Sequence, residues 1–276
     1  MANVRFVIGN AHDEATLTAT SQALPIENTQ RGERALVWRS AGLGEQIIEG
    51  TLRTGHVVSC LAILRHNLGA NGLRQVELFN GEELVYDSGP VPTALLIPAG
   101  IWQAGIDPWH ATYNDRLPTG LSATVLWLPS SYIITRYRIT VSDYGNPDGY
   151  LQISRILLGL TFSPTYNINW SPKITWQESG EHKITEGGSL RSIGRGDLRR
   201  KFDLNLDWLN DADRQQFITK MGQAGIGADV LVSLYPEASS IMQELEGTML
   251  CRREQSLATT HNLHGNWQLP LTLIEV

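Results

Sequence analysis

Asp143, Asn146 and Asp148 crowd into one short segment and offer the oxygen ligands that Ca²⁺ prefers. In a calcium-binding loop of the EF-hand type, ligands stand at positions 1, 3 and 5 and a glycine at position 6. These three residues do not have that spacing. Asp and Asn are also the usual residues of turns, because their side chains hydrogen-bond to the nearby backbone. We therefore favour turn formation over a metal site.

A second group is aromatic. Trp102, Trp109 and His110 lie in the Pro- and Gly-containing segment IWQAGIDPWH, where exposed rings could stack on a sugar. Tryptophan more often fills a core or a protein interface, because it buries a large apolar area. We favour that second role and keep sugar stacking as the alternative.

His261 and His264 are three residues apart and could share a metal ion only on a helix, but HNLHGN is typical of a loop or turn. Transition-metal sites also need more ligands than two histidines, so we predict structural roles and no metal. Cys60 and Cys251 lie within strand-like apolar runs. Buried free thiols are expected there, and no disulfide framework is indicated.

Basic residues gather in one place, which has three possible uses: DNA binding, contact with an acidic neighbouring subunit, or simple solvation. We favour the subunit contact. The cluster comprises Arg191, Arg195, Arg199, Arg200 and Lys201. Within it, Arg195-Gly196-Asp197 spells an RGD tripeptide, which we regard as a chance occurrence because so short a string carries little information.

Common enzyme motifs are absent: the sequence has no GxSxG, HExxH or phosphate-loop pattern, and its Gly-x-Gly pairs lack the third glycine. We predict that the chain is not an enzyme and has no cofactor. Its net charge of −6 argues against dedicated or sequence-specific nucleic-acid binding. No secretory signal is expected in MANVRFVIGN. Prolines interrupt the two long uncharged stretches, 88–106 and 117–135, so no membrane span is expected.

The elements that would position these residues are mostly strands. Apolar residues alternate through 132–141, with Ile133, Thr135, Tyr137, Ile139 and Val141 on the face predicted to be buried. Asn146-Pro147-Asp148-Gly149 predicts a turn, and a strand resumes at Tyr150. The apolar phase then slips near Ser154-Arg155, which predicts a β-bulge.

Further strands are expected on both sides of this hairpin. The run 56–64 is almost continuously apolar, as in a strand buried on both faces, and Asn80-Gly81 joins strands 74–79 and 82–86. Later strands are expected near 173–177, 230–235, 247–251 and 267–273. Phe202, Leu204, Leu206 and Trp208 alternate with polar residues and predict a half-buried strand.

A helix should follow over about 211–222, capped by Asn210 or Asp211 and ended by Gly222 or Gly225, with Phe217, Ile218 and Met221 on its inner face. The chain of 276 residues is long enough for two domains. Lysine appears only beyond residue 163, and Ser163-Pro164 is a natural break. We predict a mainly β protein, with a β-sandwich over 1–163 and a second β-sandwich with one flanking helix over 164–276.

Three short sequence motifs in the first domain resemble those of a known family. HNLG (66–69), QVELFNGEELVYDSG (75–89) and NPDGY (146–150) occur in the order seen in phage jelly-roll domains, so 1–163 resembles the galactose-binding-like jelly rolls of tailed-bacteriophage virion proteins. The second domain resembles the tail-tube-like sandwich of tail-tube and distal-tail proteins, through its element order and RSIGRGDLRRKFDLNLDWLNDADRQQF.

The resemblance implies a minor tail protein of the distal tail or baseplate, made in the host cytoplasm and carried in the virion. Such proteins form homo-oligomeric rings and contact tube, tape-measure and hub proteins. The alternative is a receptor-binding module of the tail tip, whose jelly roll binds host-surface carbohydrate. A glycan hydrolase ranks last, because it needs a carboxylate pair set across a cleft.

Overall fold

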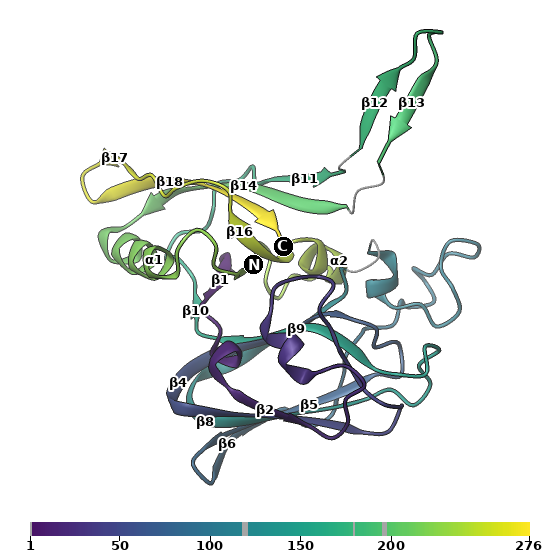
Figure 1. Ribbon diagram of the computed structural model, residues 1–276. Coiled ribbons are helices and arrows are strands. Elements are labelled where there is room, and N and C mark those ends of the chain that lie inside the picture. Colours follow the sequence, from purple (N-terminus) through teal and green to yellow (C-terminus); the bar gives the residue numbers. More distant parts are fainter. Residues whose placement is uncertain (1, 118–120, 179, 195–197) are drawn as a thin grey trace.

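The computed structural model describes residues 2–117, 121–178, 180–194 and 198–276, and within them the chain is mainly β (Figure 1). The described strands form two large sheets and one separate hairpin. This confirms the fold class predicted from the alternating apolar patterns.

The first sheet belongs to a jelly-roll-like β-sandwich built from the N-terminal part of the chain. Its strand order is β3-β9-β4-β8-β5-β6, with β2 added to β4 and β7 added to β5. The strands are β2 (Thr16–Ala19), β3 (Trp38–Arg39), β4 (Gln46–His66), β5 (Leu73–Asn80), β6 (Glu83–Asp87), β7 (Val91–Pro92), β8 (Ala123–Ser142) and β9 (Gln152–Gly159). Three short 3₁₀ helices accompany them: η1 (Ala11–Glu14), η2 (Ile26–Gln30) and η3 (Tyr113–Arg116).

Strand β8 contains the predicted 132–141 strand, and its alternation is confirmed from Tyr137 through Ile139 to Val141, all fully buried. The prediction that Ile133 shares that face is wrong. The pairing of β8 with β4 shifts register in this region, so Ile134 enters the core and Ile133 is exposed. The strand predicted over 56–64 is confirmed within β4.

The β-bulge predicted near Ser154-Arg155 is absent from β9, whose pairs with β4 keep one register from Gly159 to Ile153. The apolar phase slips for another reason: both faces of β9 are covered. Ile156 and Leu158 face the interior of the sandwich, whereas Leu157 faces the second sheet. A strand buried on both faces needs no alternation. The turns at 80–81 and 146–149 are confirmed, with Gly81 and Gly149 at positive φ.

The second sheet has the order β10-β1-β15-β16-β18-β14-β11, with β17 paired to β18. Its strands are β1 (Arg5–Ile8), β10 (Thr161–Phe162), β11 (Lys173–Gln177), β14 (Arg199–Leu209), β15 (Val230–Ser233), β16 (Thr248–Arg253), β17 (Thr260–Leu263) and β18 (Asn266–Glu275). Strand β1, close to the N-terminus, pairs with β15, which begins more than 200 residues later at Val230. The boundary near 164 stays a prediction, and the second sheet draws two strands from the sequence before it.

Helix α1 (Asp211–Ala224) follows β14 as predicted. Asn210 caps it by accepting a hydrogen bond from the Asp213 backbone N–H at 2.7 Å, and Gly225 ends it at positive φ. The placement of Trp208 on the buried face of β14 is wrong. A register shift between Leu206 and Leu209 puts Leu209 in the core and leaves Trp208 exposed.

Alternating faces of the second sheet make two cores. Phe6, Val232 and Cys251 point toward α1, where Phe217 and Met221 are buried with them. Their sequence neighbours face the jelly roll, so that Val7, Leu231 and Leu250 pack against Cys60, Ala62 and Leu157. The second sheet therefore lies between the jelly roll and α1, and an apolar core joins the two halves.

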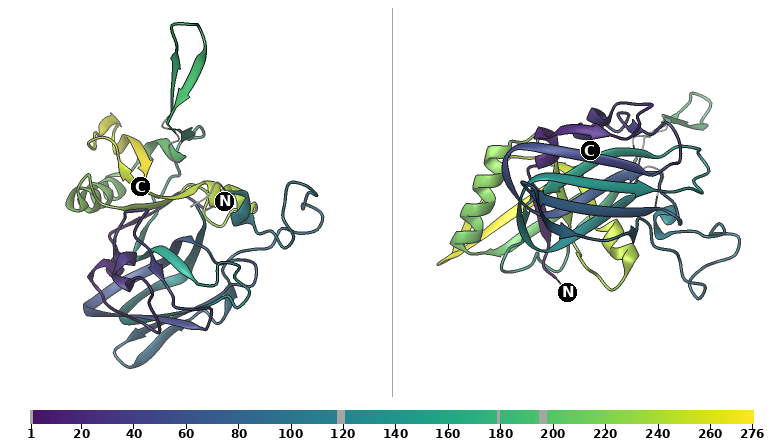
Figure 2. Two further views of the ribbon diagram at one scale, coloured as in Figure 1. Left: turned by 45° about the vertical axis from the view of Figure 1, so that its right-hand side comes forward. Right: turned by 90° about the horizontal axis from the view of Figure 1, so that it is seen from below.

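Several elements were not predicted from the sequence, among them the short strands β1, β2, β3, β7 and β17 and the 3₁₀ helices. A short helix, α2 (Ile241–Glu246), follows β15 and packs near the loop that precedes β8. A hairpin of β12 (Glu181–Ile184) and β13 (Leu190–Ile193) extends away from both sheets (Figures 1 and 2).

Candidate functional site: a projecting arm and an aromatic loop on a rigid body

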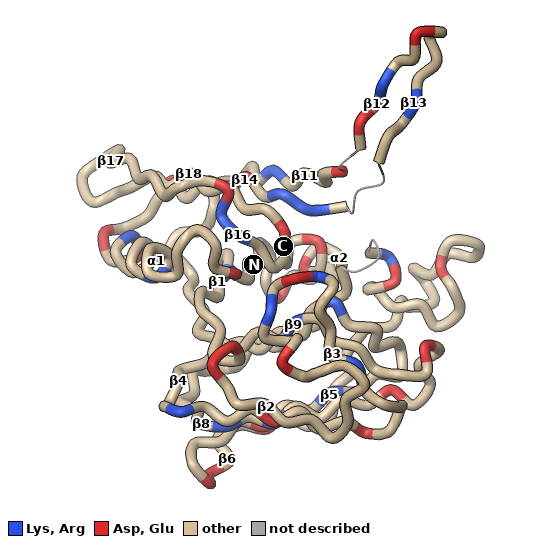
Figure 3. Tube along the Cα trace, in the orientation of Figure 1, with Lys and Arg blue, Asp and Glu red and all other residues tan. Residues whose placement is uncertain are grey.

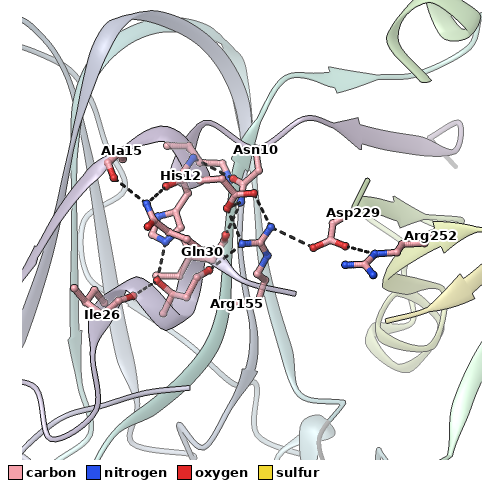
Figure 4. A network of polar contacts seen from close by, with 12 residues as sticks. Asn10, His12, Ala15, Ile26, Gln30, Arg155, Asp229 and Arg252 are labelled. Atoms are coloured by element: carbon pink, nitrogen blue, oxygen red, sulfur yellow. Dashed lines mark hydrogen bonds and ion pairs between the residues drawn. The ribbon is translucent and has the colours of Figure 1, made fainter. Parts of the chain in front are cut away.

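An ion-pair network centred on the buried Arg155 joins the two halves beside their apolar core (Figure 4). Arg155 of β9 holds both oxygens of Asp13, at 2.6 Å and 2.7 Å, and reaches Asp229 of the second half at 3.3 Å. Arg252 of β16 donates to the other oxygen of Asp229 at 2.8 Å. Arg155 is almost fully buried, so this network has a defined geometry. It fixes how the jelly roll sits on the second sheet.

His12 lies next to this network and is neutral. Thr29 Oγ1 donates to the Ile26 carbonyl at 2.7 Å, so it accepts from His12 Nε2–H at 2.8 Å, and His12 Nδ1 then accepts from Tyr137 O–H at 2.6 Å. Burial, helped by the charge of Arg155, lowers the pKa of His12 to about 3. This buried relay is structural, because both ring nitrogens are already used.

The predicted basic cluster does not form one surface. Arg200 is buried and binds both oxygens of Glu275, and its Nη1 donates to the Leu245 carbonyl at 2.9 Å. Lys201 pairs with Glu254 within the chain. The subunit-contact interpretation is therefore wrong for these two side chains. Arg191 and Arg199 are exposed, and the RGD tripeptide at 195–197 lies outside the described residues.

The β12–β13 hairpin, here called the arm (residues 181–193), has every strand residue exposed. Its strands pair with each other and with no other described strand. Thr185 and Ser189 close the turn through a backbone hydrogen bond of 2.9 Å, and Gly188 takes a positive φ there. The left view in Figure 2 shows the arm standing clear of the two sheets.

The two faces of the arm differ in chemistry because opposite residues share a face. Ile184 and Leu190 face each other on one side and are 74% and 65% exposed. The opposite side pairs Lys183 with Arg191. Figure 3 shows one basic position on each strand of the arm. The arm thus presents an apolar tip on one face and two like charges on the other.

A second projection is the loop over 98–110, which extends from the jelly roll (Figure 1). The rings of Trp102 and Trp109 are stacked with centroids 5.2 Å apart, and Trp109 is 83% exposed. Trp102 Nε1 donates to the Pro108 carbonyl at 2.9 Å. Arg116 binds both oxygens of the Asp107 carboxylate and lowers its pKa. These contacts hold an aromatic platform open to solvent, so a core role for Trp109 is wrong.

The Asx residues of the 146–149 turn are used within the fold. Asp143 accepts from the Gly69 backbone at 2.8 Å, Asn146 Nδ2 donates to the Asn67 carbonyl at 2.7 Å, and Asp148 accepts from Asn67 Nδ2 at 2.8 Å. The bonds to Asn67 hold the segments HNLG (66–69) and NPDGY (146–150) next to each other. They support turn formation over a calcium site.

The remaining candidates have structural surroundings. His261 belongs to β17 and stacks on Trp267 with centroids 4.4 Å apart, so the loop predicted for HNLHGN is wrong at His261, while His264 is exposed at the hairpin turn. Cys60 and Cys251 are buried free thiols, as expected. In the described part of the chain, no group of three metal-ligating side chains comes together. No described helix is long and apolar enough to cross a membrane.

Comparison with known proteins shows likeness in structure only. No protein-family model matches the chain. No curated protein sequence matches it either. A family 32 carbohydrate-binding module from Clostridium perfringens NanJ, in complex with galactose, is 16% identical, with a TM-score of 0.37 over 57% of this chain and 99% of the module.

Two further solved structures are similar over a comparable share of the chain. Chitosan-binding module 1 of a Paenibacillus sp. IK-5 chitosanase/glucanase is 14% identical, with a TM-score of 0.36 over 54% of this chain and 98% of its own. The lectin domain of lectinolysin, complexed with Lewis B antigen, is 9% identical, with a TM-score of 0.37 over 54% of this chain and 95% of its own. Likeness at this level does not extend to ligands.

Proposed function

We propose that this chain is a structural subunit of a tailed-bacteriophage tail, in the ring at the distal tail or baseplate, and that the arm joins neighbouring copies. The arm is the observation that carries the proposal. The protein acts by assembly and not by catalysis.

The arm needs a partner on physical grounds. A two-stranded hairpin without a covered face is at best marginally stable in water. Here Lys183 and Arg191 are directly opposite each other, which destabilises the pair further, although Glu181 lies 3.5 Å from Lys183. Ile184 and Leu190 bury apolar area only if another surface covers them. Docking would supply both the covering surface and the counter-charges.

A second copy of the chain is the partner that fits these features. The chain carries 28 acidic and 22 basic residues, and this excess of carboxylates suits the basic face of the arm. An arm that docks on a different part of its neighbour makes a heterologous contact, and repeated heterologous contacts close into rings. The junction through Arg155 and Asp229 would hold the jelly roll and the second sheet together in every copy.

The phage context rests on the resemblance of HNLG and NPDGY, which lie side by side in the fold, and of the β14–α1 segment. Tube, tape-measure and hub proteins are the proposed partners, and the virion is the proposed location. Immunoelectron microscopy of the phage particles, with antibody against this chain, tests the proposal. Label at the distal end of the tail supports it, whereas label confined to fibre tips, or particles without label, contradicts it.

The Trp102–Trp109 platform favours a second candidate function, the binding of host-surface carbohydrate. An exposed, preorganised aromatic ring can stack on the apolar face of a sugar. A glycan array probed with the full chain and with Trp109→Ala tests this. Saturable binding lost in the variant supports the sugar site, while equal signals from both proteins contradict it. Trp170→Ala, which removes another exposed tryptophan outside the loop, is the matched control.

A further inference from the structure

A cavity of about 300 Å³ lies between the start of β5, the segment around β7, the beginning of β8 and helix α2. Its size falls at the lower end of the range for small-molecule sites. Val91, Ala94, Ile241 and Leu245 supply apolar wall, and Arg74 supplies a positive charge. No residue of the arm lines the cavity, whereas its wall residues Tyr113, Ile241 and Leu245 share an apolar cluster with Trp102 of the aromatic loop.

Arg74 is 7% exposed and forms no ion pair with a described residue. Its Nε donates to Thr124 Oγ1 at 3.2 Å, but its Nη1 has no hydrogen-bond partner among the described residues. The titratable groups that affect it, Tyr86 and Cys60, are uncharged near neutral pH, since burial raises the pKa of both. Burial also lowers the pKa of Arg74 itself. Burying a guanidinium that has no ion pair and an incomplete set of hydrogen bonds costs free energy.

A second polar side chain in the cavity is also without a partner. Thr93 is almost fully buried, and its Oγ1 makes no hydrogen bond within the described part of the chain. Thr93 and Arg74 line the same cavity. Apolar walls with a few converging polar groups are the usual make-up of a ligand site. Arg74 and Thr93, which line one cavity, thus each carry a donor without a partner in the described part of the chain.

We propose that this cavity binds a small molecule with a single carboxylate, of about monosaccharide size, through Arg74 and Thr93. A carboxylate supplies the counter-charge and the acceptor oxygens that both donors lack. Glu244 of α2 also lines the cavity, where it accepts from Trp127 Nε1 at 3.1 Å. Its negative charge disfavours anions that carry two charges, so a monocarboxylate fits better than phosphate.

Calorimetry and thermal melting of the full chain with four probes test this proposal. Glucuronate and N-acetylglycine carry a carboxylate from two sources, a sugar acid and a peptide end, while glucose is neutral and inorganic phosphate is largely dianionic. We expect saturable binding and a raised melting temperature with one or both carboxylates, and the better one identifies the source. No response to either carboxylate, or equal responses to glucose or phosphate, would overturn the proposal.

Arg74→Met separates a ligand-binding arginine from a structural one. We expect at least about a tenfold loss of carboxylate affinity, because the charged partner is removed. The unliganded variant should melt at the same or a higher temperature, since an unpaired buried cation is replaced by an apolar side chain of similar length. Arg53→Met, at an exposed arginine of β4, is the matched control and should bind like wild type. Unchanged affinity in Arg74→Met would refute the assignment.

Discussion

His12 makes the fold measurably sensitive to acid. Its pKa is about 3 in the folded protein, against 6.5 as the ordinary value. Between these values the unfolded chain binds a proton that the folded chain does not, so stability falls as pH is lowered from about 6.5. His66 behaves in the same way, because burial and the charge of Arg74 lower its pKa to about 4.

The size of the effect follows from the two shifts. Each pH unit between the folded and unfolded pKa values costs about 1.4 kcal/mol per group. Lowering the pH from about 7.5 to about 5 therefore removes about 2 kcal/mol for each histidine, or about 4 kcal/mol together. Burial raises the pKa of Asp13, which acts with the opposite sign but near the acid end of the range.

Urea unfolding at several pH values, compared between wild type and His12→Gln, measures this effect. The variant should be less stable at neutral pH by about 1–2 kcal/mol, because it weakens the hydrogen bonds to Tyr137 and Thr29. Between about pH 7.5 and about pH 5, the unfolding free energy of the variant should fall by only about 2 kcal/mol, because only His66 still contributes to the pH dependence. An identical pH dependence in the two proteins would refute the buried neutral relay.

The remaining predictions concern packing and the aromatic loop. Gly50→Ala would place a Cβ against the Tyr137 ring, closer than van der Waals contact allows, so it should destabilise the jelly roll by about 1–3 kcal/mol in urea unfolding. Wild-type stability would contradict the close approach. Leu206→Asp buries an unpaired charge and should lower stability by about 3 kcal/mol or more, so wild-type-like melting would show that the face is misassigned. Trp109→Ala should leave the melting temperature within about 2 °C of wild type, because its ring is exposed, and a large drop would show a packing role.

Local chemistry explains what could be predicted from the sequence. The turn at 146–149, the strand around Tyr137 and helix α1 follow from proline, glycine, alternation and capping, all of which act between near neighbours. The errors at Ile133, Trp208 and the supposed bulge in β9 share one cause. Register and burial on both faces depend on partners that are distant in sequence.

The candidate sites depend even more on long-range contacts. The exposed tryptophan at 109 lay within a segment singled out from the sequence, but its exposure did not follow from composition. Arg74 and Arg155 gave no local signal, because an arginine within a strand pattern does not reveal whether a carboxylate meets it. The arm has Gly187-Gly188 as a turn signal between Ile184 and Leu190, which could have been found.

The oligomeric state of the purified chain tests the assembly account most directly. Sedimentation over a range of concentrations should show a closed oligomer for wild type and for Ile193→Ser, which alters the basic face of the arm. The double variant Ile184→Ser and Leu190→Ser should sediment as a folded monomer, because the apolar face is lost. A wild-type monomer at every concentration, or an unchanged oligomer in the double variant, would contradict the claim that the arm joins the subunits.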